Sequence, residues 1–338
     1  MSFGGILGGL CLAGVLGLMG LAAVLAVRSK LRLRRMRLGG APRTARRVRQ
    51  GRGLPLDHLA KRLSTTPDAL RGARCSYREV AIPKRRGGKR RLLVPDDVTK
   101  AMQRRILRRV LVGLRAHPAA TGFERGKSIV DQAAPHAGRA VVVKMDVIDF
   151  FPSTKAVRVL RYFQWIGWDR EAAEILTNLT TWEGGLPQGA PTSPRLSNLV
   201  NFYLDVQIAN RITRRGGVYT RYADDIAVSF PRARGRRVRD AIQSVRRYLR
   251  HHGYRLHTRR KLHVARRHQR QVVTGLVVNE RVRLPREIRR RLRATRHRMG
   301  KGLPPLQGEA AAQGWFAYEK MVEEQAKSRA APPPPSPR

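Results

Sequence analysis

Three aspartates in this sequence stand where strand-forming segments end. Asp146 follows an apolar, valine-rich run, and Asp224 and Asp225 lie between two further strand-forming runs, 217–222 and 226–230. A turn between these two runs would fold them into a hairpin and lift both carboxylates to the rim of a sheet. Because side chains alternate along a strand, one of the pair should face the site more directly. We predict that it is Asp224.

Carboxylates that converge on one point repel one another unless a cation neutralises them. A charge at the end of a buried strand is also costly, which makes Asp146 unusual in its run. Mg²⁺ favours a few carboxylates with water and substrate phosphates. Two such ions about 3.5–4 Å apart can activate a hydroxyl and stabilise a leaving oxygen in phosphoryl transfer. We predict that Asp146, Asp224 and Asp225 are catalytic and hold two Mg²⁺ ions. The alternatives are an ordinary Asp-Asp turn and, for Asp146, a helix N-cap.

The order of these segments resembles the motif set of reverse transcriptases. Asp146 is followed by Phe150-Phe151, then by Leu-Pro-Gln-Gly-Ala-Pro-Thr-Ser-Pro at 186–194, then by Tyr-Ala-Asp-Asp at 222–225. The resemblance covers residues 77–298. It implies a right-hand polymerase of the α+β class, with fingers, palm and thumb, that copies RNA into DNA.

Three further segments look most similar to the bacterial retron type. Residues 81–91 resemble the fingers motif before the palm, and 273–275 match the retron Val-Thr-Gly triplet. Residues 132–136 resemble the retron Asn-Ala-x-x-His element, although Gln132 stands where that element usually has Asn. The subtype implies a cognate structured RNA as template, synthesis of DNA joined to RNA, priming from an RNA 2′-hydroxyl, and a role in phage defence with an effector protein.

The resemblance also assigns roles to individual residues. The residues expected to bind the incoming nucleotide or template are Lys89 and Arg90 at the triphosphate, Phe151 as a steric gate against a 2′-hydroxyl, Gln188 and Gly189 in the proline- and glycine-rich loop, Tyr222, and Lys261 near the pyrophosphate. The residues expected to contact RNA are His136, Val273, Thr274 and Gly275. For His136 a role in organising the fold is the alternative.

Composition points to a polyanionic partner. The 338 residues carry 70 Lys and Arg against 23 Asp and Glu, a formal net charge of +47 that is spread along the chain. Such a chain should bind phosphate backbones with a strong dependence on salt, although part of the excess could be a generally arginine-rich surface. The two cysteines lie far apart, so neither a disulfide framework nor a cysteine metal cluster is expected.

The N-terminus predicts a membrane anchor. Residues 3–27 contain no charged side chain, and a basic stretch follows at 28–37. An apolar run of about 20 residues can span a bilayer as a helix. Because positive charge follows the run, we expect a cytoplasmic catalytic domain anchored to the inner membrane. A misassigned start codon and a buried helical hairpin are the alternatives.

These observations divide the chain into five parts. We predict an anchor at 1–28, a basic linker at 29–53, fingers and palm at 54–235, a thumb at 236–325 and a disordered tail at 326–338. Basic helices are expected at 236–252 and 287–299, and a hairpin between 272–278 and 282–284. Alternatives for function are a reverse transcriptase of another lineage, such as an intron-encoded enzyme, and a membrane-tethered RNA-binding protein with an idle site.

Overall fold

The computed structural model of this chain describes residues 53–329, apart from 84–86, 233 and 258–260. The predicted anchor at 3–27, the basic linker up to residue 52 and the last nine residues of the predicted tail lie outside the described residues. Within the described ranges, no helix is both long enough and apolar enough to cross a bilayer.

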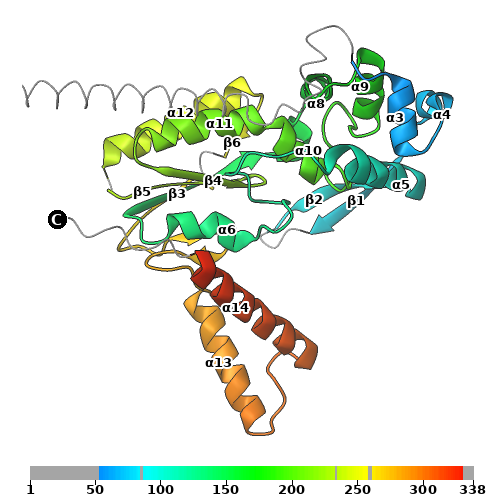
Figure 1. Cartoon of the computed structure of the whole chain (residues 1–338). Helices are drawn as coiled ribbons and strands as arrows, with labels where there is room; N and C mark the ends of the chain where they lie inside the picture. Colours follow the sequence, from blue (N-terminus) through cyan, green and yellow to red (C-terminus); the bar gives the residue numbers. More distant parts are fainter. Residues whose placement is uncertain (1–52, 84–86, 233, 258–260, 330–338) are drawn as a thin grey trace, which may run out of the picture.

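The fold is organised around an antiparallel sheet of five strands (Figure 1). Its order is β4-β5-β3-β6, with β7 also paired to β3. The strands are β3 (Val141–Ile148), β4 (Val218–Tyr222), β5 (Asp225–Phe230), β6 (Arg255–Leu256) and β7 (His263–Arg266). The predicted hairpin is confirmed: β4 and β5 pair directly, with Tyr222 opposite Asp225.

Alternate residues of the central strands pack into two separate hydrophobic cores. Val143 and Val228 point into a core completed by α11 (Phe202–Thr213) and α12 (Gly235–His251). Their neighbours Val142 and Ala227 point to the other side. This period of two is what a strand buried on both faces requires. The packing partners on that second side are α6 (Ile129–Ala133), β8 (Val272–Val273), β9 (Leu276–Val277), α13 (Arg286–Gly300) and α14 (Glu309–Arg329). In Figure 1, α11 and α12 lie above the sheet, whereas α6 and the α13–α14 pair lie below it.

A helical layer continues from one end of the sheet. It contains α3 (Leu56–Leu63), α4 (Pro67–Gly72), the π-helix at Leu107–Leu111, α8 (Ala156–Trp165), α9 (Arg170–Asn178) and α10 (Ser193–Val200), which share one apolar core. The sequence explains the break between α3 and α4. Helix α3 is followed by Ser64, whose backbone lies in the left-handed region. Helix α4 begins after Thr66, whose side chain accepts a hydrogen bond from the Ala69 N–H as an N-cap, and Pro67 occupies the first turn.

A second hairpin, β1 (Tyr77–Pro83) and β2 (Lys89–Pro95), precedes α5 (Asp97–Ile106) and is joined to the helical layer and to the loop before α10. The Leu93 N–H donates to the Gln188 carbonyl at 2.8 Å. Arg91 forms ion pairs with Glu79 and Glu183, the latter just before that loop.

The C-terminal part departs from one prediction and agrees with another. The predicted disordered tail was wrong over residues 326–329, which are the last turn of α14 and are held by an ion pair from Arg329 to Asp131 at 2.7 Å. The antiparallel pairing expected between 272–278 and 282–284 is confirmed by a bridge between Val277 and Arg283, whose backbone hydrogen bonds are 2.8 and 3.0 Å long, and β8 also pairs with β9 through a turn at Thr274-Gly275. The boundary at residue 236 stays a prediction, but the packing of α12 in the core of the catalytic sheet favours a later one.

Candidate active site

The β4–β5 turn presents the two adjacent aspartates next to β3. Ala223 and Asp224 form the two-residue turn, and Ala223 has a positive φ of 54°. Asp225 begins β5 and is directly opposite Asp146 in the ladder. The Val147 N–H donates to the Asp224 carbonyl at 3.0 Å, which ties the turn to β3. The structure therefore brings together the three aspartates that the sequence singled out.

Burial and neighbouring charges perturb the two aspartates of the turn. Burial, and then the charges of Asp146 and Asp225, raise the pKa of Asp224 to about 6. Burial also raises the pKa of Asp225, although Lys144 opposes that shift. Repulsion inside a partly buried cluster creates a demand for positive charge. That Asp224 faces the site more directly than Asp225 stays a prediction.

Two basic side chains reach the same oxygen of Asp146. Lys261 Nζ lies 2.8 Å from Asp146 Oδ2, and His257 Nε2 lies 3.4 Å from it. The backbone N–H of His257 also donates to the Asp146 carbonyl at 2.9 Å. The structure thus places Lys261 on a catalytic carboxylate, where its ammonium supplies part of the missing positive charge.

The residues present fit a divalent cation that is completed by substrate. Among the described residues, no three His, Cys, Asp or Glu side chains are grouped so as to hold a metal ion by themselves. Mg²⁺ does not need such a cage, because it is commonly bound by one or two carboxylates plus substrate phosphates. The mutual repulsion of Asp146 and Asp224 and the ammonium beside Asp146 are the observations that favour a cation here.

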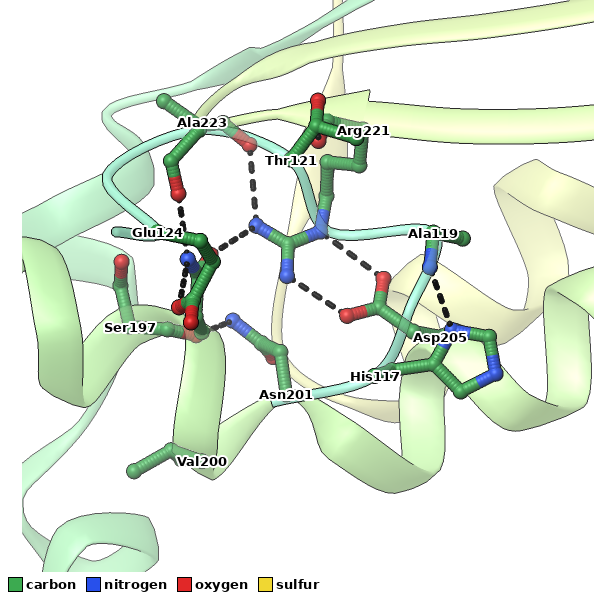
Figure 2. Close-up of polar contacts among 12 residues, drawn as sticks. His117, Ala119, Thr121, Glu124, Ser197, Val200, Asn201, Asp205, Arg221 and Ala223 are labelled. Carbon is green, nitrogen blue, oxygen red and sulfur yellow. Dashed lines mark hydrogen bonds and ion pairs between the residues drawn. The ribbon is translucent and has the colours of Figure 1, made fainter. Parts of the chain in front are cut away.

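A buried arginine supports the turn from beneath (Figure 2). Arg221 is 1 % exposed, and its guanidinium binds Asp205 with both fork positions, Nε to Oδ1 at 2.8 Å and Nη2 to Oδ2 at 2.6 Å. Its Nη1 donates to the Ala223 carbonyl at 3.2 Å and to Asn198 Oδ1 at 3.2 Å. Tyr219 also donates to Asp205, at 2.6 Å. This network links α11 to the catalytic turn.

The segment before α6 passes close to the turn. A Cβ on Gly122 would lie 2.9 Å from the Ala223 nitrogen, so the approach requires glycine. The next residue, Phe123, has a φ of 63° and is 43 % exposed. Its ring lies 5.8 Å from Tyr222 and 6.1 Å from Phe151. Phe123 therefore joins the two aromatic residues that the sequence assigned to the nucleotide site.

The segment that resembles the retron Asn-Ala-x-x-His element braces the hairpin through Gln132 and His136. Gln132 Nε2 donates to the Asp225 carbonyl at 3.0 Å. The His136 ring lies 2.7 Å from Ser229 Oγ and 2.8 Å from Thr220 Oγ1, and it is completely buried. RNA contact by the His136 side chain was therefore wrong, because both ring nitrogens are satisfied inside the protein. The fold-organising alternative accounts for its position.

The Val-Thr-Gly triplet lies against α6, the short helix that contains Gln132. Val273 is 1 % exposed and belongs to the core on that side of the sheet, so RNA contact by its side chain was also wrong. Thr274 donates to the Ile129 carbonyl at 3.2 Å, and Gly275 is exposed. Thr274 and Gly275 have positive φ values of 45° and 82°. The triplet thus forms a tight turn that packs beside α6.

The proline- and glycine-rich loop is built around a close backbone approach. Gly189 has a φ of 130°, and a Cβ there would lie 2.6 Å from the Leu93 oxygen. Gln188 is half-buried next to it. Lys89 and Arg90, at the start of β2, are exposed. The loop therefore connects β2, which carries these two cations, to the helical layer. The nucleotide-binding roles of Lys89, Arg90, Gln188 and Gly189 stay predictions.

Several residues of the site were missed from sequence. Phe123, His257, Asp205 and Arg221 touch or support the predicted site residues, as described above. Arg221 directly precedes the Tyr-Ala-Asp-Asp motif, which was its only distinguishing sign among 70 basic residues. Asp205 is the only charged residue of α11 before Arg211, and this isolation is the sequence signal that could have identified it.

Comparison with known proteins agrees with this geometry. The sequence profile of the family "Reverse transcriptase (RNA-dependent DNA polymerase)" matches residues 82–275. The chain is 37 % identical over 289 residues to the retron Mx162 reverse transcriptase of Myxococcus xanthus, covering 75 % of this chain and 59 % of that protein. It is 38 % identical over 277 residues to the Mx65 protein of the same organism, covering 75 % and 63 %.

A third relative is matched over more of its length. The chain is 33 % identical over 257 residues to the retron Ec86 reverse transcriptase of Escherichia coli, covering 75 % of this chain and 78 % of that protein. The chain belongs to the reverse transcriptase family and has its polymerase fold. Within that family it belongs with the retron reverse transcriptases. It spans about three fifths of the length of the two Myxococcus relatives.

Proposed function

We propose that this protein is an RNA-directed DNA polymerase that makes retron DNA on a cognate structured RNA. The observation that carries the proposal is the placement of Asp146 opposite Asp225, with Asp224 in the adjoining turn. In a chain of this family, that cluster is the natural position for nucleotidyl transfer. The template, the RNA–DNA duplex and the deoxynucleoside triphosphates are the partners that this activity requires.

The reaction forms one phosphodiester bond for each nucleotide. A terminal primer hydroxyl attacks the α-phosphorus, the bond from that phosphorus to the β-phosphate oxygen breaks, and pyrophosphate leaves. Divalent cations such as Mg²⁺, two in number by our proposal, would be held by Asp146, Asp224 and Asp225 and would supply charge stabilisation for both oxygens. Lys261 pairs with Asp146 before substrate arrives and would give a proton to the leaving pyrophosphate.

The surrounding residues select and orient the nucleotide in this proposal. Phe151 is half-buried against Phe150, with ring centroids 5.4 Å apart, and its ring would crowd a ribose 2′-hydroxyl. Lys89 and Arg90 are exposed on β2 and would contact the triphosphate. Gln188 and Gly189 would contact the nucleotide or the template, next to Tyr222.

In the right-hand description, the five-stranded sheet is the palm. The β1–β2 hairpin with the helical layer would form the fingers, and β8, β9, α13 and α14 would form the thumb. Helix α13 carries arginines at exposed positions and would lie along the template–primer duplex. Membrane attachment, an effector protein, priming from a 2′-hydroxyl and antiphage defence stay predictions.

The test compares the full-length protein with Asp224→Asn and with Asp97→Asn as a matched control. Asp97 is a fully exposed carboxylate on α5, with only a distant contact to Lys100 at 3.8 Å. We expect extension of a DNA primer on an RNA template by the parent and the control. Asp224→Asn should lower the rate about 100- to 1,000-fold, as a loss of several kcal/mol of charge stabilisation predicts.

Nucleic acid that co-purifies from the native locus tests the retron part separately. A small DNA joined to RNA, present with the parent and absent with Asp224→Asn, is the expected result. Primer extension without that product would assign the chain to template-general copying. RNA without DNA, equal in both preparations, would contradict the polymerase proposal.

A further inference from the structure

The outward side of α12 is a continuous arginine surface. Its exposed arginines, which we call the α12 arginine face, are Arg236, Arg239, Arg246, Arg247 and Arg250. At 3.6 residues per turn and 1.5 Å per residue, they lie within an arc of about 100° and extend for about 21 Å. The opposite arc carries the buried residues Val238, Ala241, Val245 and Leu249. The helix is thus fixed in rotation by its core side, and the arginines must point outward.

Acidic residues of the two outer helices do not neutralise this face. Helix α12 contains one acid, Asp240, which pairs with Arg215 at 3.5 Å. Helix α11 contains one acid, Asp205, which is buried beneath Arg221. The exposed Arg214, just after α11, adds a further positive charge. Within the described residues of α11 and α12, positive charge therefore exceeds negative charge at the surface.

The α12 arginine face lies across the sheet from α13. Helix α12 packs on the side reached by Val143 and Val228, whereas α13 and α14 pack on the side reached by Val142 and Ala227. Figure 1 shows the two groups of helices above and below the sheet. A duplex that lies along α13 is separated from α12 by the sheet itself. If the duplex lies along α13 as proposed, the arginine face lies outside the template–primer site.

The chemistry of the face fits a phosphate backbone. Its cations are all arginines, whose planar guanidinium can donate two parallel hydrogen bonds to one phosphate. Double-stranded RNA is recognised mainly through its shape, phosphates and 2′-hydroxyls, so an array of outward arginines suffices. A lipid surface is less suited, because an interfacial helix buries its apolar side in the membrane, and here that side is committed to the protein core.

We propose that the α12 arginine face binds a double-helical segment of RNA that lies outside the template–primer site. For the choice of RNA as the polyanion, the inference rests on the proposed function. It gives the protein two separate duplex-binding surfaces, one that carries the reaction and one that retains a structured arm of the same or another RNA.

The experiment occupies the first surface and measures the second. Full-length protein is saturated with a short DNA primer on an unstructured RNA template. A labelled blunt RNA hairpin of about 16 base pairs, the span of a typical double-stranded RNA module, is then titrated at several salt concentrations. The test variant carries Arg239→Gln, Arg246→Gln and Arg250→Gln, and the matched control carries Arg286→Gln, Arg290→Gln and Arg293→Gln on α13. Both variants remove three positive charges from exposed positions of one helix.

The parent should bind the hairpin without releasing the primer–template. The α12 variant should bind it at least about tenfold more weakly, with a salt slope smaller by about 2–3, since each lost phosphate contact removes close to one unit of slope. It should still extend the hairpin-free primer–template at the parental rate. The α13 control should show the reverse pattern. Replacing the same three α12 arginines with lysine should restore most of the salt slope while leaving affinity reduced.

Four results would overturn the inference: hairpin binding that displaces the primer–template, equal weakening in both variants, unchanged binding in the α12 variant, or a loss seen only with phosphatidylglycerol vesicles and not with the hairpin. Circular dichroism of both variants establishes that each is folded. If the parent extends no primer but binds the hairpin through α12, the proposed function fails and the inference stands.

Discussion

The buried pair of Arg221 and Asp205 offers a quantitative test of how the catalytic turn is held. Replacement of Arg221 by Met keeps much of the side-chain volume but removes the only cation that contacts Asp205 in Figure 2. The carboxylate, which is 0 % exposed, would keep a hydrogen bond from Tyr219 but lose both fork contacts. Breaking one side of a buried ion pair costs about 3–5 kcal/mol, because it leaves an uncompensated buried charge. We expect a loss of that size in the free energy of unfolding.

Urea unfolding followed by tryptophan fluorescence measures this loss. A domain with a typical stability of about 5–15 kcal/mol would still fold at low temperature. The double variant Arg221→Met/Asp205→Leu removes the orphaned charge, so it should recover most of the lost stability, because a buried pair replaced by apolar groups is often near neutral. It should not recover the rate of nucleotide addition, since the Ala223 carbonyl still lacks its donor.

Two results would refute this reasoning. A single Arg221→Met variant within about 1 kcal/mol of the parent would mean that the pair contributes little to stability, as exposed pairs do. Full activity in the double variant would mean that the turn keeps its geometry without Arg221. An Arg221→Lys variant is the conservative comparison, because it keeps the charge but cannot reproduce the two-pronged contact.

Three further predictions concern other parts of the site. The pKa of Asp224 is raised from 3.8 to about 6, so its ionised form destabilises the metal-free fold and the free energy of unfolding falls as pH rises from about 4 to 6. In the presence of chelator, Asp224→Asn should therefore raise the free energy of unfolding by up to about 3 kcal/mol at pH 7.5 and leave it unchanged below pH 4. Urea titrations at both pH values measure this difference. Gly189→Ala should destabilise the protein by about 1–3 kcal/mol more than Gly184→Ala, because both positions have positive φ but only the first brings a Cβ against the Leu93 oxygen; equal thermal shifts would contradict this. His136→Leu should cost about 1–3 kcal/mol, because the buried Ser229 hydroxyl loses its hydrogen bond to the ring while the Thr220 hydroxyl keeps only its bond to the Gln132 carbonyl; since burial lowers the pKa of His136 to about 3, NMR should find its ring neutral down to pH 4.

The sequence was most informative where local chemistry and pattern agreed. Alternating β-rich residues around an Asp-Asp pair predicted the β4–β5 hairpin, and an aspartate ending a valine run predicted its partner strand. The structure confirms the pairing of β3 with β5 and places Asp146 opposite Asp225. Helix caps depend on equally local chemistry, as Thr66 and Pro67 show at the start of α4. Each of these features depends on residues close together in the chain or on one strand register.

What could not be predicted depends on burial between distant segments. His136 and Val273 lie in motifs associated with RNA, but whether a side chain faces solvent or core is decided by packing against distant segments: His136 contacts strand residues 84 and 93 positions away, and Val273 lies in a core shared with α6. Residue type alone does not distinguish the buried Arg221 from the many arginines at the surface. Helix α14 was missed because its apolar and polar residues are poorly segregated, and its packing against α6 and α13 compensates for that weak pattern.

The contacts between α14 and α6 also bear on the order in which the protein can mature during synthesis. Arg329 reaches Asp131 and Gln325 reaches Ser128 across sequence separations of 198 and 197 residues. At about 5–20 residues per second, the ribosome needs about 10–40 s to make the chain between them. Throughout that interval α6, which supports the Asp225 carbonyl through Gln132, lacks its outer partner. A nascent chain therefore contains the β4–β5 hairpin before it acquires the full support of that hairpin.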